Sequence, residues 1–344
     1  MKVVKHRGLN MNKKRILLTG GFGYIGSAFI ERYFNRYSIT ALDVNYFGYP
    51  KKLDSKTTKM IIKDIRDISL DDLKNIEIVI HMSELSNDPM GEIDPSITKD
   101  INVVGTKKLI DLCNKSNISK FIYMSSCSVY GFNEEFANEN SKVNPLTEYA
   151  KSKVKNEEYI LNFSKNYEVK ILRNATAFGF SNNHRLDLVV NDLVYSAIKN
   201  KEIKVLSDGS PIRPVVHIVD ICRIIKDLIE TDSSKRLLLN VGHNLMNYSI
   251  KDIAMTISNL TNIDNLSFGK LDGDKRSYKV DFSYLEKSLP DFVFKYDLEK
   301  ELEALTTQEE TGESVYFPEI PRHKQSELVE IDLGDTNVST PLVN

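Results

Sequence analysis

The fold of this 344-residue chain is decided near its N-terminus by the stretch Arg15-Ile16-Leu17-Leu18-Thr19-Gly20-Gly21-Phe22-Gly23-Tyr24-Ile25-Gly26. An apolar run typical of a strand leads into a glycine-rich turn, and a helical pattern starts at about Tyr24. Gly20 permits the tight turn, Gly23 lets a bound group approach the backbone, and Gly26 lets the helix pack closely on the strand. The stretch predicts a strand, turn and helix that hold phosphate at the helix N-terminus.

Short apolar runs alternate with helical patterns through the first half of the chain, which indicates a parallel sheet with crossover helices. We predict strands at residues 15–19, 39–43, 59–62, 78–81, 121–124 and 169–173. Helices are expected from about Tyr24, over residues 106–114 and over residues 148–163. The predicted fold is a Rossmann-type, doubly wound parallel α/β sheet.

The alternation weakens beyond Arg173, where a helical stretch at 186–199 precedes a turn-rich segment. Apolar runs at 215–220 and 237–241 again predict strands, which return to the first domain. We therefore expect a smaller, discontinuous mixed α/β domain beside the Rossmann domain. The expected boundaries are 1–12 for a flexible extension, 13–180 with return segments at about 213–241 for the Rossmann domain, 181–212 and 242–305 for the smaller domain, and 306–344 for a C-terminal tail.

Composition excludes several classes of protein. The formal net charge of -2 provides no overall basic field, so nucleic-acid binding is disfavoured. Cys113, Cys127 and Cys222 lack paired spacing, which argues against disulfides or a zinc site and suits a reducing cytoplasm. No apolar run reaches membrane-spanning length, and residues 1–10 lack the shape of a signal peptide. We expect a cytoplasmic, soluble protein without a metal ion.

Asp43 closes the second predicted strand seventeen residues after Gly26, where an acid can bond a ribose 2′-hydroxyl. A carboxylate at this place repels a 2′-phosphate, and Val44-Asn45 offers no compensating cation. The expected cofactor is therefore NAD rather than NADP.

Tyr149 and Lys153 are four residues apart on a predicted helix, so the phenol and the ammonium share one face. A nearby cation favours the phenolate, which allows a tyrosine to transfer protons near neutral pH. On their own the two residues are better explained as part of an exposed polar helix face. The rest of the chain has to decide between these interpretations.

Further motifs follow in a fixed order along the chain. They are Asp64-Ile65-Arg66-Asp67, His81-Met82-Ser83, Asn102-Val103-Val104-Gly105-Thr106, Ser125-Ser126-Cys127-Ser128-Val129-Tyr130-Gly131 and Arg213-Pro214-Val215-Val216-His217. With the glycine-rich turn and the Tyr149/Lys153 pair, they make the chain resemble the extended short-chain dehydrogenase/reductase family, in particular its nucleotide-sugar epimerase and dehydratase branch. The resemblance runs from about Lys14 to Leu305.

The resemblance implies a role for each matching residue. Ser126, four before Tyr130, stands at the family's catalytic Ser/Thr position, with Tyr149 as the proton-transfer group and Lys153 beside it. It also implies Asp64 and Ile65 around the adenine, and Met82 and Ser83 along the cofactor. The complete expected NAD site is Gly20, Phe22, Gly23, Tyr24, Ile25, Gly26, Asp43, Asp64, Ile65, Met82, Ser83 and Lys153.

Which reaction is expected follows from the residues after Ser126. The 4,6-dehydratases of the family carry an Asp-Glu pair there, whereas this chain has Cys127 and Ser128. Decarboxylating relatives place a Glu where Ser128 stands, and in the 3,5-epimerases the catalytic cysteine lies one position later than Cys127. Cys127 is therefore interpreted as a packing residue, and the expected activity is epimerisation, most simply at C4, by transient oxidation.

Two other functions remain open from the sequence. One is a keto-sugar reductase or dehydrogenase with the same Ser/Tyr/Lys residues and an exchangeable cofactor. The other is a redox-inert binding protein on the same fold, because a fold alone does not define a function.

The expected substrate is a nucleoside-diphosphate sugar, and the resemblance places Thr176, Asn191, Arg213 and Arg276 against it. Guanidinium groups suit a diphosphate. His81 and His217 lack a matching set of ligands and are interpreted as structural. Relatives pair through the helices near 106–114 and 148–163, so the resemblance also implies a homodimer.

Overall fold

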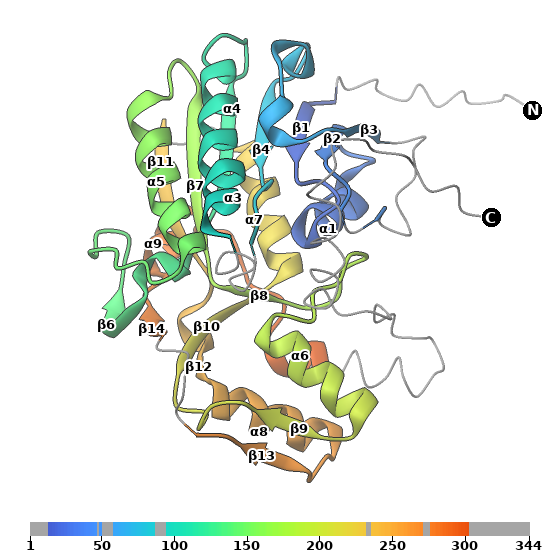
Figure 1. Cartoon of the computed structure of the whole chain (residues 1–344), viewed down its shortest axis with the longest axis vertical. Helices are drawn as coiled ribbons and strands as arrows, with labels where there is room; N and C mark the ends of the chain where they lie inside the picture. Colours follow the sequence, from blue (N-terminus) through green and yellow to red (C-terminus); the bar gives the residue numbers. More distant parts are fainter. Residues whose placement is uncertain are drawn as a thin grey trace, which may run out of the picture.

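The computed structural model describes residues 13–46, 48–49, 58–86, 94–231, 235–270 and 276–302. Its centre is a sheet of seven strands in which every neighbouring pair is parallel (Figure 1). This arrangement confirms the predicted Rossmann-type, doubly wound sheet. In spatial order the strands are β3 (Lys59–Ile62), β2 (Ser38–Asp43), β1 (Arg15–Thr19), β4 (Ile78–His81), β5 (Lys120–Ser126), β7 (Glu168–Asn174) and β11 (Arg236–Val241).

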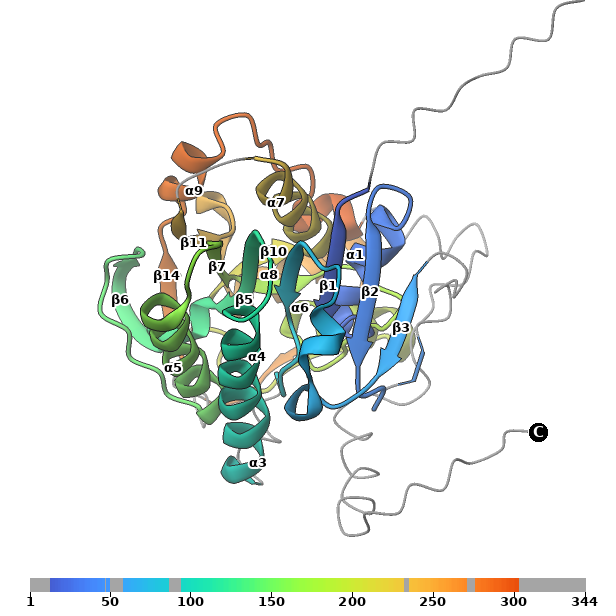
Figure 2. The same ribbon diagram turned by 90° about the horizontal axis from the view of Figure 1, so that it is seen from above.

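Helices cover both faces of this sheet, as Figure 2 shows from above. Successive strand residues point to opposite faces, so Leu17 and Leu18 enter different cores. Leu18 packs with α1 (Tyr24–Tyr33) and α7 (Ile218–Glu230), and Leu17 packs with α4 (Gly105–Cys113) and α5 (Glu148–Phe163). A short helix, α3 (Pro95–Lys99), leads through a π-helical turn into α4. Within the described ranges, none of the helices has the length and apolar character required to cross a membrane.

A second group of elements lies below the large sheet in Figure 1. Its core contains apolar residues of α6 (Val189–Tyr195) and α8 (Ile250–Thr261), such as Val194 and Ile257. The helix predicted at 186–199 corresponds to α6 and the π-helical turn that continues it to Asn200. The strands pair as β8 (Thr176–Phe178), β10 (Ile212–His217) and β12 (Asn247–Ser249), as β9 (Ile203–Val205) with β13 (Leu266–Phe268), and as β6 (Phe132–Ala137) with β14 (Ser277–Val280), which α9 (Ser283–Ser288) follows.

The strand predicted at 215–220 is wrong beyond His217, where β10 ends and α7 begins. His217 caps the new helix, because its Nδ1 accepts the Val219 N–H at 3.2 Å. The apolar run continues with helical rather than alternating spacing, and Ile218, Ile221 and Ile225 are all fully buried. β10 also joins β8 and β12, whereas β11 pairs with β7 as an edge strand of the large sheet. Only the strand at 237–241 therefore returns to that sheet.

Replacing Ile225 by Ala tests the packing of α7 on the sheet. We expect Ile225→Ala to lower the free energy of unfolding by about 2–5 kcal/mol, because the side chain is fully buried and its loss leaves a cavity. Met255→Ala on α8 is the matched control, since that side chain is 45% exposed, and should cost less than about 1 kcal/mol. Urea denaturation measures both, and equal losses would contradict the packing described here.

Candidate active site

The glycine-rich turn joins β1 to α1 with almost no space above its backbone. Gly20 has φ +72°, and a Cβ on it would lie 2.7 Å from the Met82 carbonyl carbon. A Cβ on Gly26 would lie 2.3 Å from the Gly20 oxygen, so only glycine permits α1 to approach the turn this closely. Within the described residues, no side chain caps the α1 N-terminus at Gly23. Its N–H groups can therefore serve a diphosphate.

Asp43 is held beside this turn at the carboxyl end of β2. Its Oδ2 accepts the Phe22 N–H at 3.0 Å, and its Oδ1 accepts the Asn45 N–H at 2.9 Å. Both bonds orient the carboxylate next to the phosphate-binding turn, as a ribose-binding acid requires. The turn and this acid together fit the NAD that the sequence predicts.

Two predicted cofactor residues have mainly structural contacts. Tyr24 is buried, and its hydroxyl donates to the Gly179 carbonyl at 2.5 Å, which joins α1 to the segment after β8. Burial raises the pKa of Tyr24, so it remains a neutral donor. Ile65 is also buried and faces Gly105, where a Cβ would lie 2.8 Å from the Ile65 Cγ2. Ile25, by contrast, is only partly buried on α1.

Asp64 lies at the carboxyl side of β3 and caps the 3-10 turn Ile65–Asp67. Its Oδ1 accepts the Arg66 N–H, and the Arg66 guanidinium bonds both of its oxygens at 2.8 and 3.0 Å. Burial acts to raise the pKa of Asp64, but the hydrogen bonds and charge of Arg66 outweigh it and lower the pKa. Asp64 is thus a fixed carboxylate at the edge of the sheet.

The end of β4 is fixed by a buried histidine. The Thr106 hydroxyl donates to the Asn102 carbonyl, so His81 Nε2–H donates to Thr106 and His81 Nδ1 accepts from Thr19. Burial, with a smaller contribution from the Lys153 charge, lowers the pKa of His81 to about 3. His81 is therefore neutral and structural, as predicted. Thr19 Oγ1 in turn accepts the N–H groups of Met82 and Ser83, at 3.3 and 3.4 Å.

The three predicted catalytic residues belong to β5 and to the helix α5 beside it. Ser126 ends the strand, and its Oγ accepts the Ser128 N–H at 3.1 Å. Tyr149 and Lys153 come from α5, which Thr147 caps by accepting the Ala150 N–H. The Lys153 Nζ lies 5.3 Å from the centre of the Tyr149 ring and donates to the Met124 carbonyl. Tyr149 and Lys153 are thus neighbours, and Lys153 contacts the backbone of β5 two residues before Ser126.

Glu84 is a residue of this site that the sequence reasoning missed. It lies three residues after the end of β4, and its Oε2 lies 2.5 Å from the Lys153 Nζ. Both side chains are almost wholly buried, with 2% and 4% exposed. A carboxylate immediately after the predicted cofactor residues Met82 and Ser83 was the available sequence signal.

Behind Ser126 the chain is tightly packed. Cys127 is fully buried and its thiol lies 3.1 Å from the Arg173 carbonyl. Burial raises the pKa of the Cys127 thiol well above its usual range, so it does not supply a thiolate base. These contacts confirm its interpretation as a packing residue. In the described ranges, no group of three His, Cys, Asp or Glu side chains is placed to hold a metal ion.

Two of the predicted substrate residues are neighbours. Arg213 on β10 donates to the carbonyls of Ile212 and Arg276, and its guanidinium lies 5.6 Å from the Tyr278 ring centre. The two arginines therefore lie side by side in space although 63 residues separate them in the sequence. Thr176 begins β8 and pairs with Val215 of β10, on the same small sheet.

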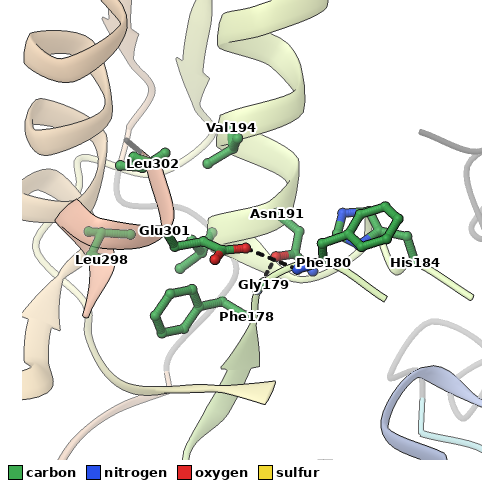
Figure 3. Close-up of a pocket in the computed structure, with 10 residues that line it drawn as sticks. Phe178, Gly179, Phe180, His184, Asn191, Val194, Leu298, Glu301 and Leu302 are labelled. Atoms are coloured by element: carbon green, nitrogen blue, oxygen red, sulfur yellow. Dashed lines mark hydrogen bonds between the residues drawn. The ribbon is translucent and has the colours of Figure 1, made fainter. Parts of the chain in front are cut away.

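Asn191 lines a pocket between β8, α6 and residues 298–302 (Figure 3). Its Oδ1 accepts the Gly179 N–H at 3.1 Å, and its Nδ2 donates to the Tyr24 hydroxyl and the Arg185 carbonyl. Across the pocket, Glu301 accepts the Phe180 N–H at 3.1 Å. Asn191 thus orders the backbone around the pocket, which is otherwise mostly apolar.

A model of the NAD dependent epimerase/dehydratase family matches residues 16–242. The chain belongs to this family and is an NAD-dependent enzyme. The glycine-rich turn and Asp43 described above fit that cofactor. The family also agrees with the resemblance to the nucleotide-sugar branch of the extended short-chain dehydrogenases/reductases.

Individual relatives carry different activities in their names. A protein of Methanocaldococcus jannaschii, provisionally named UDP-glucose 4-epimerase, is 32% identical over 217 residues, which cover 60% of this chain and 71% of that protein. The dTDP-D-glucose 4,6-dehydratase of Dictyostelium discoideum is 25% identical over 277 residues, covering 72% of this chain and 62% of the relative. The family membership therefore leaves the choice between epimerase and dehydratase to the residues of the site.

A solved structure shows the same fold. UDP-N-acetylglucosamine 4-epimerase from Methanobrevibacter ruminantium M1, in complex with UDP-N-acetylmuramic acid, matches with a TM-score of 0.76 at 24% identity. The match covers 87% of this chain and 100% of that structure. At this identity the likeness supports the fold alone.

Asp43→Ser tests the nucleotide-binding end of the site. We expect the affinity for NAD to fall about 10- to 100-fold, since a hydrogen bond to a charged group contributes about 1.5–3 kcal/mol. The preference for NAD over NADP should shrink as well, because the carboxylate that repels a 2′-phosphate is gone. Calorimetric titration of cofactor-free protein measures both affinities.

Asp67→Ser is the matched control for Asp43→Ser, because Asp67 is exposed on the neighbouring 3-10 turn. It should leave both affinities within about twofold of the original protein. An Asp43→Ser protein with unchanged NAD affinity would contradict the role given to Asp43.

Proposed function

We propose that this protein is an NAD-dependent 4-epimerase of a UDP-sugar. The observation that supports it best is the composition of the site at the end of β5. Ser126, Tyr149 and Lys153 supply proton transfer at a sugar hydroxyl, while Cys127 and Ser128 stand where a dehydratase needs two carboxyl groups. Such a site can oxidise and reduce a carbon but lacks the acid and base for elimination.

The proposed roles follow from these contacts. NAD, when bound, supplies reversible hydride transfer at the sugar carbon. The Tyr149 phenolate takes the proton of the 4-hydroxyl as that carbon is oxidised, and returns the same proton to the oxygen when the ketone is reduced on its other face. Ser126 donates a hydrogen bond to the same oxygen and keeps it in line. Lys153 places its positive charge beside the Tyr149 ring and favours the phenolate.

The substrate class rests on the small sheet and on the relatives. Arg213 and Arg276 lie next to each other and offer cations for a diphosphate, which the net charge of -2 does not attract by itself. We place Thr176 against the sugar and Asn191 near the phosphates, in both cases from the resemblance. The uridine base is inferred from the UDP-sugar 4-epimerases among the relatives.

Turnover of defined sugars tests this function. Purified protein without added cofactor is incubated with UDP-glucose, UDP-N-acetylglucosamine or UDP-glucuronic acid, and the products are followed by NMR. We expect one of these sugars to equilibrate with its C4 epimer while no NAD is consumed overall. A 4-keto-6-deoxy product would show a dehydratase instead, and turnover that requires added NADPH would show a reductase.

Tyr149→Phe tests the proposed chemistry at its centre. The variant keeps the ring beside Lys153 but lacks the hydroxyl, so kcat should fall at least about 100-fold while NAD affinity stays within about twofold. Tyr159→Phe, on the exposed part of the same helix, removes a hydroxyl bonded to Asp111 and serves as the control with unchanged kcat. Full activity of Tyr149→Phe would exclude the mechanism.

A further inference from the structure

Outside the residues that the family resemblance explains, the most unusual feature of the site is a second buried charge. Glu84 lies at the carboxyl end of the central strand β4, and its side chain is only 2% exposed. A carboxylate in such a place is unfavourable unless it is paired and hydrogen-bonded. The structure shows both forms of compensation.

One carboxylate oxygen of Glu84 is devoted to anchoring. Its Oε1 accepts the Tyr123 hydroxyl at 2.6 Å and the Asn156 amide at 3.0 Å. The backbone of the next residue, Leu85, is held by Asn102, which accepts its N–H at 2.8 Å and donates to its carbonyl at 3.0 Å. Glu84 therefore has a fixed position.

The other oxygen meets the Lys153 ammonium. Glu84 Oε2 and the Met124 carbonyl both lie at 2.5 Å from Nζ, while the ring centres of Tyr123 and Tyr149 lie 4.8 and 5.3 Å away. Contacts on several sides define where the ammonium sits. We propose that Glu84 is a positioning residue, which holds the Lys153 ammonium protonated and in one place beside Tyr149.

The electrostatics agree with this geometry. Burial acts to lower the pKa of Lys153, but the charge and hydrogen bond of Glu84, with the charges of Tyr149 and Glu157, together outweigh burial and raise the pKa. Burial, followed by the Glu84 charge, raises the pKa of Tyr123 well above its usual range, so Tyr123 remains a neutral donor. His81 is neutral as well.

Two other charged pairs border the site. On α5, Glu157 binds Arg173 of β7 at 2.6 Å. Beyond β8, Arg185 binds Asp187 at 2.6 Å. Each of these charges has its own partner, whereas Glu84 is the carboxylate that contacts Lys153. Glu84→Gln therefore removes the charge opposite Lys153 and keeps a side chain of similar shape.

The first test needs no substrate. Wild-type and Glu84→Gln proteins are compared by thermal unfolding between pH 6 and 9. In the wild type the pKa of Lys153 is raised on folding, so its stabilising contribution is complete over this range and is lost only above the ordinary lysine pKa of about 10.4. In the variant the largest contribution opposing burial is lost and only the smaller ones of Tyr149 and Glu157 remain, so we expect the folded-state pKa to fall below that value and the charged lysine to destabilise the fold at low pH. The deficit in Tm should be largest at pH 6 and shrink towards pH 9.

Tyr123→Phe is the control for this test, because it removes a hydrogen bond to Glu84 but leaves the charge opposite Lys153. Its deficit in Tm should be the same at pH 6 and pH 9. A Glu84→Gln deficit that is equally constant would overturn the proposal, since a purely structural role predicts that result.

The second test uses the pH dependence of kcat and rests on the proposed epimerase function. In Glu84→Gln, Tyr149 experiences the full Lys153 charge, so the acid limb should move to lower pH. The alkaline limb, at which Lys153 loses its proton, should move in the same direction, each by about one pH unit or more. Glu84→Asp keeps the charge and should lower kcat while leaving both limbs near their wild-type positions.

The outcomes separate the two proposals. If none of the sugars is turned over, the proposed function fails, and the thermal test still decides the role of Glu84. If the sugars are turned over but both limbs of Glu84→Gln coincide with those of the wild type, the positioning role is excluded.

Discussion

The site depends on keeping one cation charged inside the protein. The Lys153 side chain is only 4% exposed, and a lone ammonium in such surroundings would lose its proton. It remains charged because a carboxylate from the end of β4, a carbonyl from β5 and two aromatic rings surround it. The parallel pairing of β4 with β5 brings their carboxyl ends together next to α5 and so assembles these groups. The arrangement of the sheet thus allows Lys153 to remain protonated inside the protein.

The same sheet edge explains why the cofactor end and the catalytic end are connected. Gly20 approaches the backbone of Met82 so closely that a Cβ has no room, and two residues later the chain supplies Glu84. Thr19 bonds both His81 and the N–H groups of Met82 and Ser83. A shift of the phosphate-binding turn would therefore move the segment that holds Lys153. The glycine-rich turn and the residue that contacts the ammonium are therefore joined by the contacts between β1 and the segment after β4.

Much of this could be predicted from the sequence because the signals are local. The glycine spacing, the acid at the end of β2 and the alternation of strands and helices all follow from periodicity and turn chemistry. The strand expected at 215–220 was wrong because apolar residues such as Val215, Val216 and Ile218 fit a buried strand and a buried helix equally well. The start of the helix is marked instead by the hydrogen bond from the Val219 N–H to the His217 ring. The pairing of β10 with β8 and β12 is a long-range contact that no local pattern contains.

Glu84 was missed because its role depends on a long-range contact, whereas the expected residues are recognised by their local spacing. Tyr149 and Lys153 can be recognised by their spacing of four residues. Glu84 and Lys153 are 69 residues apart in the sequence and come into contact only in the folded protein. Asn191 shows the converse: its sequence position suggested a ligand contact, yet its amide also bonds Gly179, Tyr24 and Arg185.

The choice of reaction resides in side chains rather than in the fold. Ser126 accepts the Ser128 N–H at the start of a 3-10 turn that extends from Cys127 to Tyr130, so its side chain helps to shape the backbone at these positions. Cys127 is fully buried beside the Arg173 carbonyl, where the larger side chain of a carboxylic acid would need additional space. Converting the proposed epimerase into a dehydratase would therefore require new packing behind Ser126 as well as carboxylic acids in place of Cys127 and Ser128. The contacts among Tyr149, Lys153 and Glu84 could remain unchanged.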